Sequence, residues 1–168
     1  MVRETLIVAD ASPVIGLAKI GRLTILDHLA VEVLIPRAVW NEIVGRGGDR
    51  PEVTIIAQRF ERFVRDPDGR LAAEFQQHVD AGEAAALALA SANPGCLLLI
   101  DDAAGRELAE AHRLRCIGTA GLLLRARKAG LIESLALDLG ALKREGIFIR
   151  DELIRKLLEA AGELPPDG

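Results

Sequence analysis

The feature that most constrains the fold is a short, uninterrupted apolar run that ends in two acids. The run Cys96–Ile100 is followed at once by Asp101 and Asp102. Apolar runs of this length, bounded by turn-forming residues, are typical of strands that are buried on both faces. A second such run, Thr5–Ala9, ends at Asp10. These strands predict a mainly parallel sheet that is covered by helices on both faces.

Helical patterns separate the strand candidates along the chain. The first helix is predicted to have Ser12 as its N-cap and Pro13 at its first helical position, with a break at Gly21. Further strands are expected at 31–35 and 116–117, with a strand-like segment at 147–149. Further helices are expected near 38–44, 52–58, 71–79, 83–92, 103–114, 119–129 and 135–143, and a last helix carries an apolar stripe from Leu153 to Ala161 and ends at Gly162. This βαβα order predicts the α/β class.

The length and charge of the chain narrow the classes of protein further. With 168 residues, half of them apolar and 27% charged, the chain is expected to form a single domain over 1–168, with a core at 5–132 and a C-terminal extension at 133–164. The net charge of −4 excludes a protein whose whole surface is basic. Function is therefore sought in local sites.

Cysteine spacing and hydropathy indicate the compartment. Cys96 and Cys116 lack the CxxC spacing of a zinc module and do not suggest a disulfide framework, which fits a reducing cytoplasm. The longest uncharged stretch, residues 84–100, is interrupted by Asn93-Pro94-Gly95, so neither half could span a bilayer. We expect a cytoplasmic protein without a membrane segment.

Acidic residues fall where ligands bind in open α/β sheets, beyond the carboxyl ends of the strands. Candidates of this kind are Asp10, Glu42 in the helix after the second strand, Glu83 at a helix start, Asp101 and Asp102. Such carboxylates, with no obvious basic partner, would repel one another unless a divalent cation such as Mg²⁺ or Mn²⁺ neutralised them. The pattern suits metal-assisted phosphodiester hydrolysis with water as the nucleophile.

Each candidate also has a structural interpretation. Asp101 and Asp102 could be a solvated strand end and a helix N-terminal charge, and Glu83 occupies a position that the helix dipole favours. Ser12 fits a cap better than a nucleophile. Thr119 could cap a helix or hydrogen-bond a metal-bound water or a phosphate.

Basic residues are concentrated between 103 and 130, where six bases and two acids give +4 and leave −8 for the rest of the chain. This segment could supply a rim that binds an RNA backbone. The candidates for RNA contact are Arg106, Arg113, Arg125 and Lys128. Alternatively, Arg106 and Arg113 pair with Glu110 on a solvated helix face.

Together, the motifs resemble those of a PIN-domain protein, in the small prokaryotic group related to VapC toxins. The resemblance covers residues 5–132 in order and extends loosely to the last helix. Its motifs are Asp10-Ala11-Ser12-Pro13, the segment from Ile35 to Glu42, Gly82-Glu83 before an alanine-rich helix, Leu99-Ile100-Asp101-Asp102 followed by Arg106, and Gly118-Thr119-Ala120-Gly121.

The resemblance implies a three-layer α/β/α fold and a Mg²⁺- or Mn²⁺-dependent ribonuclease. It implies that the five acidic candidates, Glu42 among them, are the catalytic residues, and that Ser12 and Thr119 support the site. Asp10, Glu83, and Asp101 or Asp102 would hold the metal. It further implies an RNA substrate, a cognate antitoxin protein and a homodimer.

Two other functions remain open from the sequence. A PIN-like protein could lack activity and serve as a binding or assembly module. In a haloacid-dehalogenase-like phosphatase, Asp10 would be the covalent nucleophile, but that motif requires a second acid where Ser12 stands.

Overall fold

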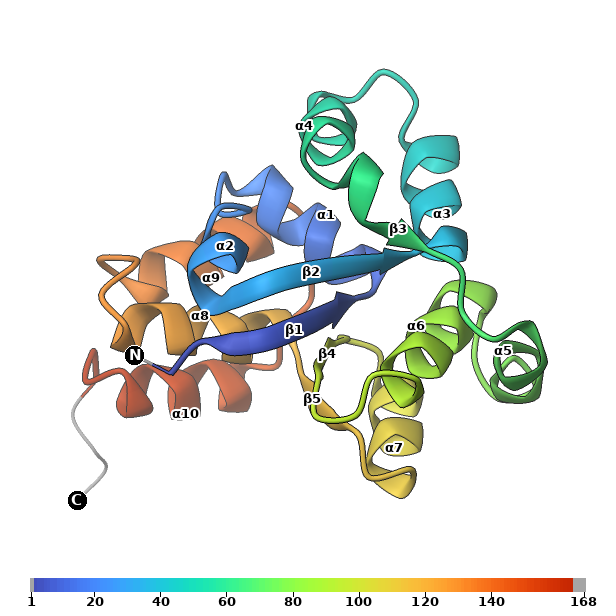
Figure 1. Cartoon of the computed structure of the whole chain (residues 1–168). Coiled ribbons are helices and arrows are strands. Elements are labelled where there is room, and N and C mark those ends of the chain that lie inside the picture. The colour runs from blue at the N-terminus through green and yellow to red at the C-terminus, as the bar shows by residue number, and fades with distance from the viewer. Residues whose placement is uncertain (1, 165–168) are drawn as a thin grey trace.

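A parallel β-sheet forms the centre of the structure, a computed structural model that describes residues 2–164 (Figure 1). Within this part of the chain the strands are β1 (Glu4–Ala9), β2 (Ala30–Pro36), β3 (Val64–Arg65), β4 (Leu97–Leu99) and β5 (Arg115–Ile117). Their spatial order is β3-β2-β1-β4-β5, and each neighbouring pair is parallel. The most apolar strands of the sequence, β1 and β4, are thus neighbours, and both have strands on either side.

Helices cover both faces of this sheet, which confirms the three-layer α/β/α prediction (Figure 1). They are α1 (Ala11–Lys19), α2 (Ile25–Leu29), α3 (Arg37–Gly47), α4 (Pro51–Phe60), the 3₁₀ helix η1 (Glu61–Phe63), α5 (Gly69–Phe75), α6 (Ala81–Ser91), α7 (Ala103–Ala111), α8 (Thr119–Lys128), α9 (Leu135–Arg144) and α10 (Asp151–Ala160). A helix-containing connection follows each of the first four strands, as parallel pairing requires.

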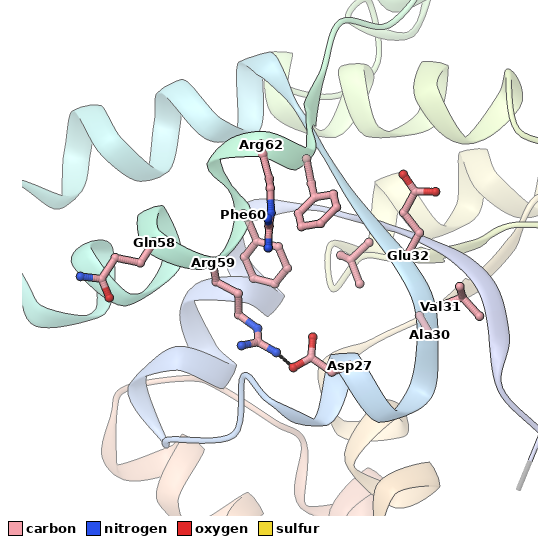
Figure 2. A pocket seen from close by; sticks show the side chains of 10 residues that line it. Asp27, Ala30, Val31, Glu32, Gln58, Arg59, Phe60 and Arg62 are labelled. Atoms are coloured by element: carbon pink, nitrogen blue, oxygen red, sulfur yellow. Dashed lines mark ion pairs between the residues drawn. The ribbon is translucent and has the colours of Figure 1, made fainter.

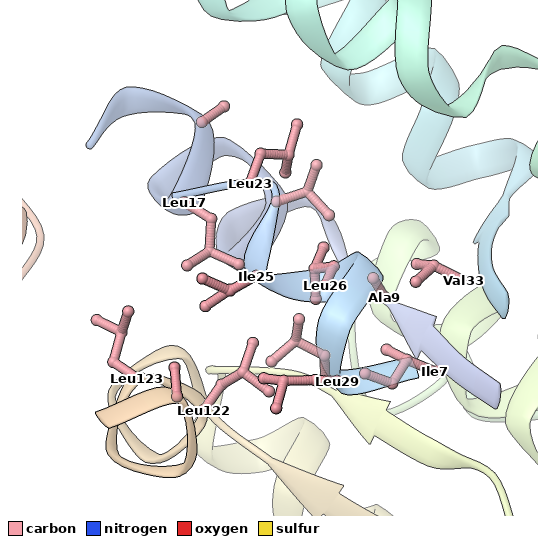
Figure 3. Packing of buried hydrophobic residues seen from close by; sticks show 14 of the residues in the cluster. Ile7, Ala9, Leu17, Leu23, Ile25, Leu26, Leu29, Val33, Leu122 and Leu123 are labelled. Atoms are coloured by element: carbon pink, nitrogen blue, oxygen red, sulfur yellow. The ribbon is translucent and has the colours of Figure 1, made fainter. Parts of the chain in front are cut away.

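The strands divide their side chains between two cores, because successive residues of a strand point to opposite faces. Ile7 and Ala9 belong to the larger core, to which α1, α2 and α8 contribute (Figure 3). Val8 and Leu98 belong to the smaller core, which lies under α5, α6 and α7. Both faces of the central strands are therefore buried, as their continuous apolar sequences predicted.

The structure corrects two details of the sequence interpretation. Helix α1 begins at Ala11 with Asp10 as its N-cap residue, so Ser12 lies inside the first turn and does not cap it. The segment 147–149 is not a strand: Ile147 and Ile149 pack inward, whereas Phe148 is 87% exposed. The three apolar residues suggested a strand, but among the described residues the segment is not part of the sheet.

The C-terminal helix α10 packs against α8 and α9 through one apolar side. After it, the Glu163 carboxylate accepts hydrogen bonds from the backbone N–H groups of Leu135 (2.6 Å) and Ala136 (2.8 Å) and from Arg127 Nε (3.1 Å). These contacts fix the end of the chain to the start of α9. Among the described residues, no helix is long and apolar enough to cross a membrane.

Candidate functional site

Asp10 lies at the carboxyl end of the central strand β1 and is almost fully buried, with 5% of its surface exposed. Its backbone N–H donates to the Leu99 carbonyl at 3.0 Å, which extends the pairing of β1 with β4 by one residue. Because the chain turns directly into α1, the carboxylate stays at the edge where the strands end. The sheet itself therefore positions this side chain.

The negative charges of three acids act on Asp10: Glu42 of α3, and Asp80 and Glu83 at the start of α6. Burial raises the pKa of Asp10 to about 7; a backbone hydrogen bond from Ala11 opposes the rise, and the three negative neighbours add to it. Near neutral pH, a substantial fraction of Asp10 is protonated in the metal-free protein. A cation bound at this carboxylate would therefore compete with a proton.

Asp80 and Glu83 form a reciprocal cap at the N-terminus of α6. The Glu83 N–H donates to Asp80 Oδ1 at 2.8 Å, and the Asp80 N–H donates to Glu83 Oε2 at 3.2 Å. Burial raises the pKa of Glu83, the bond from Asp80 N–H opposes this, and the charges of Asp80, Asp102 and Glu42 raise it further. The cap thus holds two carboxylates close together beside Asp10.

The sequence interpretation missed Asp80. Its signal was available, because an acid three residues before a Glu at a helix start is the pattern of a capping box. Glu83 is a predicted site residue, and Asp80 caps the same helix.

Gly82 allows α3 and α6 to approach one another at this edge. A Cβ atom on Gly82 would lie 2.8 Å from Glu42 Oε2 and 3.5 Å from Asp80 Oδ1. The other oxygen of Glu42 accepts a hydrogen bond from the exposed Arg46 at 3.3 Å. The absent side chain at position 82 therefore leaves room for the Glu42 carboxylate.

Asp101 and Asp102 are adjacent in the chain but form hydrogen bonds with different residues. Asp101 accepts hydrogen bonds from Thr119 N–H (2.7 Å) and from Thr119 Oγ1 (2.6 Å), which joins the ends of β4 and β5. Asp102 caps α7 by accepting from the Gly105 N–H at 2.8 Å, and its charge contributes to the raised pKa of Glu83. Asp102, rather than Asp101, is therefore coupled to the Asp10 group.

Gly118 and Arg106 complete the surroundings of Asp101. A Cβ on Gly118 would lie 2.9 Å from Asp101 Oδ1 and 3.3 Å from Arg106 Nη1. The guanidinium of Arg106, an exposed residue of α7, is thus close to the Asp101 carboxylate. Arg106 is the RNA-contact candidate that lies beside the acids.

The structure places Arg125 elsewhere. Its Nη1 pairs with Glu4 at 3.1 Å. Glu4 is the first residue of β1, and a strand of this length places it about 20 Å from the carboxyl end of β1. Lys128 and Arg125 line a hollow with Val2 at this amino edge of the sheet. Arg113 follows α7 with a positive φ of 58°. Arg125 and Lys128 are therefore not brought to the acidic edge.

A model of the PIN domain matches residues 6–163 of the chain. The chain belongs to the PIN-domain family. No curated protein and no solved structure gave a match. PIN domains are in general nucleases, and they typically use divalent metal ions. The membership also removes the reason to read Asp10 as the nucleophile of a phosphatase.

The carboxylates of this PIN domain suit a hard divalent cation in kind, because such ions prefer oxygen ligands. Within residues 2–164, however, no three His, Cys, Asp or Glu side chains are arranged as a metal-binding group. Glu83 and Asp102 are engaged in helix caps, and Asp101 is bonded to Thr119. The donors fit the metal chemically, and side-chain rotation would be needed to bring them to one ion.

Proposed function

We propose that this PIN domain is an endoribonuclease that uses Mg²⁺ or Mn²⁺ to hydrolyse RNA. The observation that carries the proposal is the buried Asp10, whose pKa is raised to about 7 by its burial and, further, by the nearby Glu83, Asp80 and Glu42. A fold that buries a carboxylate among other carboxylates carries an electrostatic cost. A divalent ion would offset that cost.

The metal would be held by Asp10, Glu83 and Asp102, with Asp101 as the remaining candidate. When bound, the ion would orient the scissile phosphate and activate a water molecule for attack. Glu42 lies within the same electrostatic group and could accept a proton from the water. Asp80 would hold Glu83 in place through the α6 cap.

The residues around Asp101 would position the substrate. Thr119 holds both oxygens of Asp101, and the nearby Arg106 offers a guanidinium to a phosphate of the RNA backbone. Ser12 is exposed in the first turn of α1, two residues after Asp10. Its hydroxyl could contact the same phosphate. Arg113 is retained as an RNA contact at the end of α7, whereas Arg125 and Lys128 could contact only RNA that reaches the opposite edge.

The resemblance to VapC-related proteins supports a narrower role. We propose a toxin of a toxin–antitoxin pair, acting as a homodimer in the cytoplasm and inhibited by a cognate antitoxin. We also propose that residues 133–164 belong to the same domain, since α10 packs on α8 and α9. A short neighbouring gene that encodes a DNA-binding protein would support the toxin role.

Cleavage by the variant Asp10→Asn tests the enzymatic proposal. We expect the rate of Mg²⁺- or Mn²⁺-dependent RNA cleavage to fall about a hundredfold or more, because even residues that only support a metal ligand cost up to that factor. Asp49→Asn, the same change at an exposed loop residue, is the matched control and should cleave normally. An unchanged rate for a folded Asp10→Asn protein would refute the mechanism.

An inactive binding module is the second candidate, favoured by the lack of a ready-made three-ligand group in the described chain. Calorimetric titration with Mg²⁺ and Mn²⁺ separates the two candidates. The nuclease must bind at least one of the ions with an affinity that Asp10→Asn reduces. Absence of binding with all carboxylates present would favour the module.

A further inference from the structure

Gly82 occupies the second position of helix α6, where the backbone does not require a glycine. Its φ lies outside the left-handed region that favours glycine. Within a helix, alanine is the more favourable residue. The two hydrogen bonds of the α6 cap join Asp80 and Glu83 and involve no atom of residue 82. The helix itself therefore gives no reason for a glycine at this position.

A methyl group at position 82 would collide with a carboxylate of the site. The Cβ of an alanine there would lie 2.8 Å from Glu42 Oε2, closer than carbon and oxygen atoms normally approach. Its next neighbours, Asp80 Oδ1 at 3.5 Å and Val39 Cγ2 at 3.6 Å, are at ordinary contact distances. Glu42 belongs to α3, so the collision would lie between two helices. The group that the methyl would displace is therefore the end of the Glu42 side chain.

The Glu42 carboxylate uses the space that Gly82 leaves. Its Oε1 accepts a hydrogen bond from Arg46 at 3.3 Å, and its Oε2 lies next to position 82. From this place its charge acts on both Asp10 and Glu83. To reach an ordinary C···O distance, the carboxylate would have to move away from the start of α6 by about 0.5 Å or more. The side chain is 29% exposed, so it can move into solvent without disturbing either helix.

The same relation recurs at Gly118. Its φ of −92° is also ordinary, and a Cβ atom there would lie 2.9 Å from Asp101 Oδ1. Among the glycines of residues 2–164, Gly82 and Gly118 are the two whose Cβ would come within 3.0 Å of a carboxylate oxygen. Both oxygens belong to acids that the sequence predicts as site residues. Where other glycines are crowded, as Gly105 is by Ile100, the close neighbour is an apolar side chain.

Charges elsewhere on the sheet are compensated by opposite charges. A hollow of about 310 Å³ beside β2 is lined by acids and bases together, and its Asp27 and Arg59 form an ion pair (Figure 2). At the carboxyl edge, Asp10 and Glu83 form no ion pair with any residue in the described part of the chain. Backbone bonds and the space left around the side chains therefore set where these carboxylates lie.

We propose that Gly82 is a positioning residue of the nuclease: its lack of a side chain keeps the Glu42 carboxylate within the acidic group around Asp10. The inference rests on the proposed function, in which Glu42 accepts a proton from the attacking water. Proton transfer depends on the distance between donor and acceptor, and a misplacement of about 1 Å can lower a rate about a hundredfold. A displacement of about half that size should therefore lower the rate about tenfold.

The variant Gly82→Ala of the full chain tests the proposal, with kcat for RNA cleavage measured in saturating Mn²⁺ and again in saturating Mg²⁺. We expect kcat to fall about tenfold. The midpoint of thermal unfolding should be no lower than that of the wild-type chain, because alanine is favoured over glycine in a helix. Gly69→Ala is the matched control, since Gly69 opens α5 and its Cβ would meet nothing within 4 Å. An unchanged kcat or a lowered midpoint for Gly82→Ala overturns the proposal.

A double-mutant cycle shows whether Gly82 acts through Glu42. Glu42→Asp shortens the side chain by one methylene and withdraws the carboxylate from position 82. Added to Glu42→Asp, the change Gly82→Ala should therefore alter kcat by less than about twofold, although it lowers kcat about tenfold in the wild-type chain. An equal loss in both backgrounds would mean that the methyl group acts on the helices in general, and it would overturn the proposal.

Carbon NMR of the Glu42 carboxyl group in metal-free protein separates this proposal from the nuclease function. Gly82→Ala should shift the Glu42 resonance, whereas Gly69→Ala should leave it in place. An unmoved resonance in Gly82→Ala overturns the positioning role even if the wild-type chain cleaves RNA. If the wild-type chain cleaves no RNA and the resonance moves, the nuclease function fails, and the placement of Glu42 by Gly82 is supported.

Discussion

At the scale of single residues, Asp10 shows how the site opposes its own ionisation. Its backbone is fixed by the bond to the Leu99 carbonyl, so the side chain cannot leave the buried edge without disturbing the sheet. Burial and three neighbouring carboxylates disfavour its charge, and the pKa rises from the ordinary 3.8 to about 7. The charged form of Asp10 therefore destabilises the fold locally.

This loss should be measurable as a dependence on pH in metal-free protein. Between 3.8 and about 7 the folded state binds a proton at Asp10 that the unfolded state has released, so the free energy of unfolding falls as pH rises. Asp10→Asn cannot ionise and should escape this fall. Above pH 7 it should be the more stable protein, by up to about 4 kcal/mol.

Urea unfolding of both proteins in EDTA, from acid to mildly alkaline pH, checks this prediction. Mg²⁺ or Mn²⁺ should then stabilise the wild-type chain and have little effect on Asp10→Asn. Parallel pH profiles for the two proteins would contradict the assigned pKa.

At the scale of elements, helix ends hold the acids and the C-terminal segment in place. Asp80 and Asp102 cap α6 and α7, so each carboxylate is fixed by a backbone N–H as well as by its own chain. Glu163, which follows α10, accepts hydrogen bonds from backbone N–H groups at the N-terminus of α9. Burial opposes the ionisation of Glu163, but four hydrogen bonds hold its pKa below the ordinary range.

Glu163→Gln should loosen α10 without unfolding the sheet. A neutral amide has one acceptor oxygen, so it cannot satisfy the N–H groups of Leu135 and Ala136 together with Arg127. We expect hydrogen exchange of the α10 amides to accelerate about tenfold, with little change at β1. Glu133→Gln, at an exposed position before α9, is the control.

The acid sensitivity of the same contact follows from the lowered pKa of Glu163. The stabilisation is present above the ordinary pKa of a glutamate and is lost as pH falls through the lowered value. Exchange of α10 should therefore accelerate in acid for the wild-type chain and much less for Glu163→Gln. Equal exchange in both proteins at neutral pH would show that Glu163 does not hold the helix.

At the scale of the whole molecule, the parallel sheet separates two kinds of charge. Because the strands are parallel, their carboxyl ends all lie at one edge of the sheet, and the coupled acids lie at this edge. At the opposite edge, Glu4 is buried and pairs with Arg115 of β5 (2.8 Å) and Arg125 of α8 (3.1 Å). These contacts join the start of the central strand to the last strand and to the helix that follows it.

Glu4→Gln should destabilise the whole fold, because it leaves two arginines without their buried counter-charge. We expect a loss of about 1 to 3 kcal/mol in the free energy of unfolding, measured by urea denaturation. Glu32→Gln, an exposed change on β2, should cost little. The pKa of Glu4 is lowered, chiefly by the hydrogen bond from Arg115. The stabilisation that Glu4 provides should therefore also disappear as pH falls through the lowered pKa. A loss equal to that of Glu32→Gln would contradict the prediction.

The sequence by itself determined the α/β class, the buried strands and the acids that follow them. These properties depend on local patterns: continuous apolar runs, helix-start residues and the polarity of parallel strands. Asp10, Asp101 and Asp102 could be placed at the ends of strands, because they follow directly after apolar runs. The position of Glu83 at a helix start was also readable, and Asp80 could have been read with it.

Only the tertiary structure decided which of these residues meet. It coupled Asp102 to Glu83 and turned Asp101 toward Thr119, although the two acids are adjacent in the chain. It also placed Arg125 at the far edge and left one side of β2 open. Side-chain direction, helix approach and strand coverage depend on contacts between distant segments, and periodicity within one segment carries no information about them.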